Sequence, residues 1–73
     1  MGRLAQVLPH RMLRALVRLG WTVSRQSGSH AVLAKPGRNP VTVPVHPGTL
    51  KLGTARSILK QAGLTEDEFF DNY

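Results

Sequence analysis

Three clusters of turn-forming residues divide the middle of this sequence into short segments. They occupy residues 27–29 (Ser-Gly-Ser), 36–40 (Pro-Gly-Arg-Asn-Pro) and 47–49 (Pro-Gly-Thr). Clusters of glycine and proline mark tight connections between secondary-structure elements. Because parallel strands need a long crossover, such short connections predict antiparallel strands. The middle of the chain is therefore expected to form a three-stranded meander.

The segments between the clusters have the character of strands. Residues 21–26 alternate between apolar and polar side chains, which predicts a half-buried strand. Residues 30–35 form the second predicted strand, but their periodicity does not fix the face that His30 takes. In residues 41–46 the valines alternate, and Pro44 predicts an edge strand or the end of the strand because it lacks an N–H donor.

Helical periodicity flanks these strands on both sides. Residues 9–19 predict a first helix that begins at Pro9 and stops at Gly20. Its apolar face is expected to contain Met12, Leu13, Leu16 and Val17, and its basic stripe Arg11, Arg14 and Arg18. Residues 1–8 are expected to be a poorly constrained lead.

A second helix is predicted to end at Gly63, where Leu64 folds back in a Schellman-like contact. Its apolar face is expected to contain Leu52, Ala55, Ile58, Leu59 and Ala62. Thr65 and Glu68 then form a capping box that opens a short acidic helix. Two helices can cover one face of a three-stranded sheet. The prediction for residues 1–73 is thus one α+β domain, a two-layer α-β-β-β-α sandwich with a short extra C-terminal helix.

The charge distribution points to a polyanionic partner. The sequence contains ten Lys and Arg but only four Asp and Glu, which gives a formal net charge of +6. All four acidic residues lie between positions 66 and 71. Nucleic acid is the leading candidate for such a surface, with a merely solubilising surface as the alternative. The absence of cysteine excludes a disulfide scaffold and a thiolate nucleophile. Without an apolar signal segment or membrane span, a cytoplasmic protein is expected.

Three blocks of sequence resemble the HicA toxin family. They are residues 25–30 (Arg-Gln-Ser-Gly-Ser-His), 43–46 (Val-Pro-Val-His) and 53–64 (Gly-Thr-Ala-Arg-Ser-Ile-Leu-Lys-Gln-Ala-Gly-Leu). The resemblance covers the chain from about residue 8 to residue 70. It implies a fold similar to double-stranded-RNA-binding domains, translation-independent cleavage of mRNA, and neutralisation by a HicB-type antitoxin. It also implies that His30, in the Gly-Ser-His motif, is the catalytic residue.

The chemistry of histidine agrees with that role. Cleavage of RNA without a metal needs a base for the 2′-OH proton and an acid for the leaving oxygen, and imidazole serves both near neutral pH. His46 is a candidate second proton carrier, phosphate contact or structural residue, and Ser29 a candidate hydrogen-bond partner of His30 or of a phosphate. Three histidines without cysteine or well-spaced carboxylates make a poor metal site. No metal or small-molecule cofactor is therefore expected.

Several basic residues are candidate contacts to the RNA backbone. They are Arg25, Lys51, Arg56 and Lys60, with a solvated basic face as the alternative for each. Trp21 is interpreted as a core residue in preference to a base-stacking platform. The principal function predicted is that of a metal-independent endoribonuclease toxin. The alternative is a non-catalytic double-stranded-RNA-binding module, which has no need of an imidazole at position 30; a DNA-binding subunit is disfavoured because no helix-turn-helix spacing is present.

Overall fold

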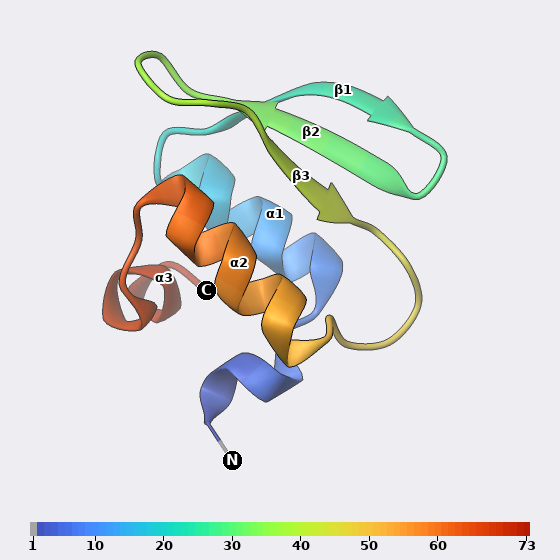
Figure 1. Ribbon diagram of the computed structural model, residues 1–73, viewed down its shortest axis with the longest axis vertical. Helices are drawn as coiled ribbons and strands as arrows, with labels where there is room; N and C mark the ends of the chain where they lie inside the picture. Colours follow the sequence, from blue (N-terminus) through green and yellow to red (C-terminus); the bar gives the residue numbers. More distant parts are fainter. Residues whose placement is uncertain (1) are drawn as a thin grey trace.

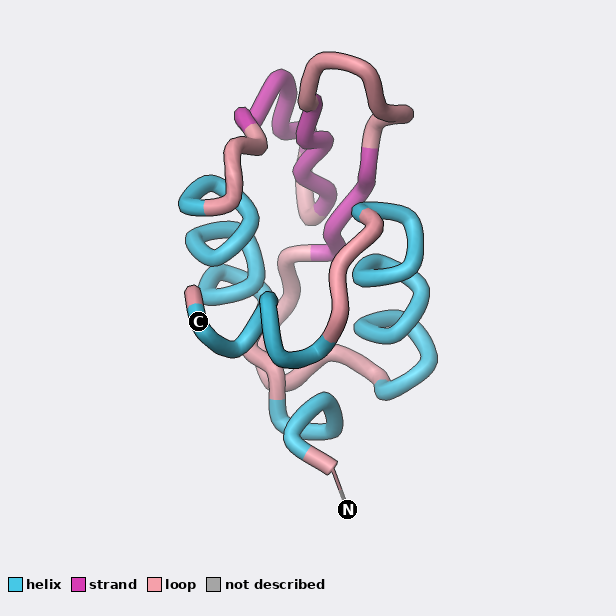
Figure 2. Tube along the Cα trace, turned by 90° about the vertical axis from the view of Figure 1, so that its left-hand side faces the viewer, coloured by secondary structure: helices cyan, strands magenta, loops and turns pink. Residues whose placement is uncertain are grey.

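The computed structural model describes residues 2–73 and contains a three-stranded sheet beside a layer of helices (Figure 1). The elements, in chain order, are η1 (Arg3–Gln6), α1 (Pro9–Arg18), β1 (Thr22–Ser27), β2 (His30–Ala34), β3 (Val41–Pro44), α2 (Leu52–Ala62) and α3 (Glu66–Asp71). The strands are antiparallel in the order β1-β2-β3. Helices α1 and α2 lie on one side of the sheet, and α3 runs between them (Figure 2). The predicted α+β order and antiparallel meander are confirmed.

Register and burial together define the two faces of the sheet. Ala31 pairs with Val43 and Leu33 pairs with Val41, and all four side chains are completely buried. Since directly paired residues of an antiparallel ladder share a face, these pairs form the inner face against the helices. The alternate residues of β2 and β3 therefore lie on the outer face, which no helix covers. Pro44 ends β3, which is an edge strand, as its missing donor predicts.

The first strand differs from its prediction. Its alternation of apolar and polar residues predicts half-burial, yet all six residues of β1 are exposed. There are two physical reasons. β1 is the edge strand that lies away from α2 (Figure 1), and the register shifts between Val23 and Arg25, which interrupts the alternation. Trp21, immediately before the strand, is 1% exposed and belongs to the core as expected.

Both long helices end where glycine permits them to end. Gly20 follows α1 with φ of 100°, and Gly63 follows α2 with φ of 71°. At Gly63 the turn is a complete Schellman motif, because Gly63 N–H donates to Lys60 O at 3.2 Å and Leu64 N–H donates to Leu59 O at 2.9 Å. A side chain at position 63 would also meet the guanidinium group of Arg38, since a Cβ there would lie 2.6 Å from Arg38 Nη2. The left-handed backbone therefore favours glycine at this position, and any other residue would also displace the end of the Arg38 side chain.

The apolar faces of the helices are largely as predicted, with two exceptions. Met12 and Leu16 of α1 are buried, and Leu13 packs against the core at its edge. Val17 is 50% exposed and Leu52 is 37% exposed, so both were wrongly assigned to the core-facing sides of their helices. Val17 lies beside the overhanging β1, and Leu52 is the first residue of α2, where little of the chain covers it.

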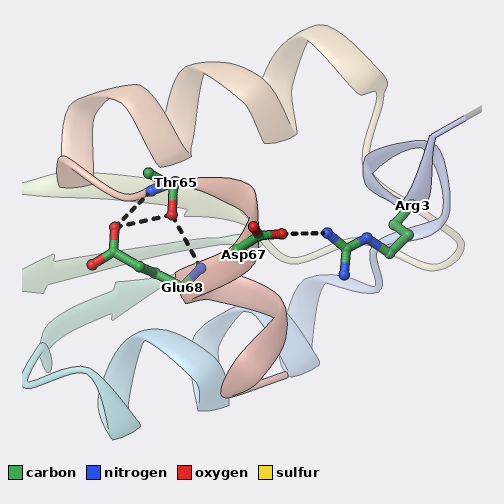
Figure 3. A network of polar contacts seen from close by, with 4 residues as sticks. All are labelled: Arg3, Thr65, Asp67 and Glu68. Atoms are coloured by element: carbon green, nitrogen blue, oxygen red, sulfur yellow. Dashed lines mark hydrogen bonds and ion pairs between the residues drawn. The ribbon is translucent and has the colours of Figure 1, made fainter.

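The N-terminal segment is ordered by packing, contrary to the expectation of a poorly constrained lead. Within the described residues, Leu4 of η1 and Val7 are buried, and Leu50 N–H donates to Val7 O at 2.8 Å. The part of that expectation that concerns Met1 lies outside the described residues. The capping box at α3 is confirmed: Glu68 N–H donates to Thr65 Oγ1 at 3.1 Å, and Thr65 N–H donates to Glu68 Oε1 at 3.0 Å (Figure 3).

Candidate functional site

His30 lies at the first position of β2, on the outer face of the sheet. It is exposed, whereas the next residue, Ala31, is buried on the inner face. The sequence periodicity did not fix the face of the sheet that His30 takes, and the structure shows that it is the outer face. The sheet holds His30 in the central strand between Ser27 of β1 and Pro44 of β3. An imidazole at this place is accessible from the open side of the sheet.

Arg25 is the cation that shares this face with His30. Arg25 pairs with Val32, and Ser27, two residues further along β1, pairs with His30. Arg25 and His30 are therefore diagonal neighbours, a relation that places Cα atoms roughly 7–8 Å apart in an antiparallel pair. Arg25 makes no hydrogen bond or ion pair with the described residues. Its guanidinium group is thus available to a phosphate that approaches His30.

Ser29 and His46 are brought to the same end of the sheet. The N–H of Val45 donates to the carbonyl of Ser29, which joins the turn before β2 to the segment after β3. His46 follows directly, is exposed, and has Nδ1 2.9 Å from Pro47 O. Because a carbonyl only accepts, Nδ1–H is the donor in this contact, and Nε2 has no hydrogen-bond partner among the described residues.

The candidate contacts on α2 lie elsewhere. Arg56 and Lys60 line a shallow cleft of about 360 Å³ together with Leu4 of η1 and Glu66 of α3. This cleft is on the helical layer, whereas His30 is on the opposite side of the sheet. Lys51 immediately precedes α2, at the end of the connection from β3. The structure therefore groups Arg25, Ser29 and His46 with His30, and it separates Arg56 and Lys60 from them.

The basic stripe of α1 is largely engaged by the C-terminal residues. Arg11 donates to Tyr73 O at 2.8 Å and lies over the Tyr73 ring, and Arg18 donates to Asn72 O at 3.0 Å. Arg3 of η1 forms an ion pair with Asp67 at 3.1 Å (Figure 3). Of the three stripe residues only Arg14 is without a hydrogen bond or ion pair within residues 2–73. Sequence reasoning did not foresee this, because the contacts join residues more than fifty positions apart.

Sequence reasoning also missed an open groove between α1 and β1. Val17 was assigned to the core and Val23 to a half-buried strand, but both line this groove, together with His10 and Arg14. The only sequence signal was the mixture of arginines and aliphatic residues along α1, which equally describes an ordinary amphipathic helix. No helix within residues 2–73 has the length and apolar character needed to cross a membrane.

These features define a double-stranded-RNA-binding-like α+β fold with an exposed histidine on the open face of its sheet. Residues 10–64 match the family model described as the HicA toxin of bacterial toxin–antitoxin systems. The chain is also similar to a solved structure described as "Toxin-Antitoxin complex from Streptococcus pneumoniae", with 37% sequence identity and a TM-score of 0.71. That similarity covers 80% of this chain and 98% of the other. A comparison with curated proteins gives no match.

The chain belongs to the HicA toxin family, because the matching segment spans well over half of its residues. The match begins within α1 and ends at Leu64, directly before the Thr65 that caps α3. The elements η1 and α3, which hold one another through Arg3 and Asp67, therefore lie outside the matched segment.

Proposed function

We propose that residues 1–73 act as a single domain, a toxin that cleaves mRNA without a metal and that is neutralised by a HicB-type antitoxin in the cytoplasm. The observation that carries this proposal is the position of His30. A family-typical Gly-Ser-His motif presents its imidazole on an uncovered sheet face, beside an unengaged Arg25. A non-catalytic RNA-binding module would have no requirement for an imidazole at that place.

The proposed reaction is an internal transfer at phosphorus. His30 accepts the proton of a ribose 2′-OH, the 2′-oxygen attacks the adjacent phosphorus, and the bond to the 5′-oxygen of the next nucleotide breaks. An acid protonates the departing 5′-oxygen, so the products are a 2′,3′-cyclic phosphate and a 5′-hydroxyl. His46 is the candidate acid, a role that requires its imidazolium form with a proton on Nε2, and its backbone is held at the same end of the sheet. Arg25 and Ser29 are the proposed phosphate contacts at this centre, and Lys51, Arg56 and Lys60 are proposed contacts to parts of the RNA backbone further from it.

The decisive variant is His30→Ala. General acid–base catalysis contributes about 10²–10⁴-fold, so cleavage of a long RNA should fall by that factor or more. RNA affinity and thermal stability should change little, because the side chain of His30 is exposed and makes no hydrogen bond with the described residues. The measurement is the initial rate of RNA cleavage by purified protein, together with growth arrest on expression. A His30→Ala protein that cleaves at the wild-type rate would refute the assignment, and binding without cleavage by the wild type would favour the RNA-binding alternative.

Cleavage is also expected to survive a chelator. Within residues 2–73 no group of three or more His, Asp or Glu side chains is placed to hold a metal ion. The rate in excess EDTA should therefore equal the rate without it, on the same RNA and at the same ionic strength. Loss of cleavage on chelation that is restored by magnesium or zinc would overturn the metal-free mechanism while leaving the choice of substrate intact.

A further inference from the structure

An open groove runs along the side of α1 that faces the start of β1. Its volume is about 470 Å³, and it is lined by His10, Leu13, Arg14, Val17, Arg18 and Val23. The floor is aliphatic, with Val17 50% exposed and Val23 39% exposed. Together with Leu52, these are the large apolar side chains that the structure leaves most exposed among the described residues. We call this feature the α1–β1 groove.

The groove exists because β1 extends past the helical layer. Val23 pairs with Leu33, which is completely buried, so Val23 points to the inner side of the sheet. No described helix lies far enough out to cover it, and every residue of β1 is exposed. Val17 contributes from α1 to the same opening. Two branched apolar side chains thus line one concave surface, unlike the scattered single exposures that are normal on a protein.

The rim of the groove is basic. His10, Arg14 and Arg18 are spaced four residues apart along α1, and no carboxylate lines the groove. Residues at this spacing share a helix face, and eight residues of helix extend about 12 Å. The Arg14 side chain makes no hydrogen bond or ion pair with the rest of the described chain, and Arg18 uses Nη1 for Asn72 O. The groove therefore offers an aliphatic floor with cationic groups along one side.

This combination selects among possible partners. Phosphates of a nucleic acid would use the rim but would gain nothing from the aliphatic floor. A second copy of this chain offers carboxylates on α3, but Phe69 there is completely buried in its own core. A protein segment with aliphatic side chains on one face and carboxylates beside them would use both the floor and the rim.

We infer that the α1–β1 groove receives an acidic amphipathic helix of the antitoxin, about two turns long. Aliphatic side chains of that helix pack on Val17 and Val23, and its carboxylates pair with Arg14 and Arg18. This inference rests on the proposed function for the identity of the partner. The groove is on the helix side of the sheet, whereas His30 is on the open side, so it is an anchoring site distinct from the catalytic site. The antitoxin is then held behind β1 while another part of it reaches His30.

The test is Val17→Asp, which places a carboxylate at the centre of the groove. The probe is the purified HicB-type antitoxin that restores growth to cells expressing the wild-type protein. Affinity should fall by about 30-fold or more, the scale of a central interface residue. Arg14→Glu should weaken binding through the rim without altering the floor. RNA cleavage by both variants should be unchanged, so that each remains toxic but escapes neutralisation.

The matched control is Leu52→Asp. Leu52 is also an exposed apolar residue at 37%, but it lies at the start of α2, away from the groove. Its substitution adds the same charge and should alter antitoxin affinity less than about 3-fold. Circular dichroism and thermal unfolding of all three variants check folding, which should persist because Val17 is half exposed.

Several outcomes would overturn the inference. Wild-type affinity of Val17→Asp, or equal weakening by Leu52→Asp, would remove the groove from the interface. Loss of RNA affinity in Val17→Asp would assign the groove to nucleic acid. If the wild type sediments as a dimer and Val17→Asp sediments as a monomer, the groove would be assigned to a second copy of the chain. Failure of the proposed function is a separate result: the wild type then cleaves no RNA, whatever the affinities of the variants.

Discussion

The basic side chains on the two sides of this molecule have different surroundings. On the open face of the sheet, Arg25 lies near His30 without a partner among the described residues. On the helical side, Arg3, Arg11 and Arg18 hold the C-terminal residues through an ion pair and two carbonyl contacts. The number of arginines in the sequence therefore does not measure the size of an RNA-binding surface. Part of the formal charge of +6 serves to attach α3 to the rest of the fold.

Five of the ten basic residues donate hydrogen bonds within the described chain. They are Arg3, Arg11, Arg18, Lys35 and Arg38. The other five, Arg14, Arg25, Lys51, Arg56 and Lys60, have no such partner within residues 2–73. Four of these five are the proposed contacts to RNA. Substitutions can therefore test this comparison: residues that make hydrogen bonds within the chain should affect stability, and those that make none should affect RNA binding.

The largest expected effect on stability is at Phe69. Phe69 of α3 is completely buried and packs against Phe70 and Tyr73, with ring centroids 4.9 and 5.3 Å away. Replacing a buried phenylalanine with alanine costs about 3–5 kcal/mol. The free energy of unfolding of Phe69→Ala, measured by urea titration, should fall by that amount, whereas His30→Ala should leave it nearly unchanged. Phe69→Leu provides a milder variant if Phe69→Ala does not fold, and equal stability of Phe69→Leu and wild type would contradict a structural role for α3.

The next effect is the salt dependence of RNA binding. If Arg25, Lys51, Arg56 and Lys60 neutralise about four phosphates, log K against log salt should fall with a slope of roughly −3 to −4. Each single alanine substitution should weaken binding to every RNA sequence alike and should flatten the slope by just under one unit. Fluorescence anisotropy over a range of salt concentrations measures both quantities.

Two triple alanine variants sharpen this prediction. Replacing Lys51, Arg56 and Lys60 should remove most of the salt dependence. Replacing Arg11, Arg14 and Arg18 should change it less, because two of those guanidinium groups are held by backbone carbonyls. A flat salt response in the wild type would refute the electrostatic interpretation. A steep response lost only in the α1 variant would place the RNA backbone against α1 and would remove the three residues of the α2 variant from the interface.

The smallest expected effect concerns Glu68 in acid. Hydrogen bonds from the backbone N–H and the hydroxyl of Thr65 hold the pKa of Glu68 below its ordinary value. The folded state thus favours the ionised form, so this contribution is present above the ordinary pKa and is lost as the pH falls through the lowered one. Amide hydrogen exchange in α3 should become faster relative to α1 between about pH 6 and pH 3. Glu68→Gln should remove that pH dependence, and an unchanged profile in this variant would show that other groups cause it.

Local signals in the sequence predicted the fold well where the physical cause is local. Gly63 and Leu64 predicted the Schellman turn, Thr65 and Glu68 predicted the capping box, and Pro44 predicted the end of an edge strand. Such features depend on residues within a few positions of one another, so a short stretch of sequence contains all the information. The face of the sheet that His30 occupies was not predictable from β2 alone, because it depends on which helices cover which side.

Errors occurred where burial depends on distant segments. The alternation in residues 21–26 predicted a half-buried strand, but the helical layer is too narrow to cover β1. Val17 follows the same helical periodicity as Leu13 and Leu16, which predicted that it is buried. It is exposed because it lies at the open groove beside β1. The sequence predicted that Arg11 and Arg18 belong to an exposed basic stripe. Their hydrogen-bond partners, residues 72 and 73, lie against α1 only in the folded protein.

The attachment of the C-terminal residues also has a consequence for the order in which the chain can fold. Arg3, Leu8, Arg11 and Arg18 bond to residues that follow them by 54 to 65 positions. Each of these contacts closes a loop that includes most of the sequence, which is entropically unfavourable until the intervening elements are in place. During synthesis, η1 and α1 emerge before residues 65–73, so their polar groups find these partners only after those residues have been added. The hairpin of β1 and β2, whose pairs are close in sequence, needs no such delay, and contacts between the two ends are expected to form last in refolding.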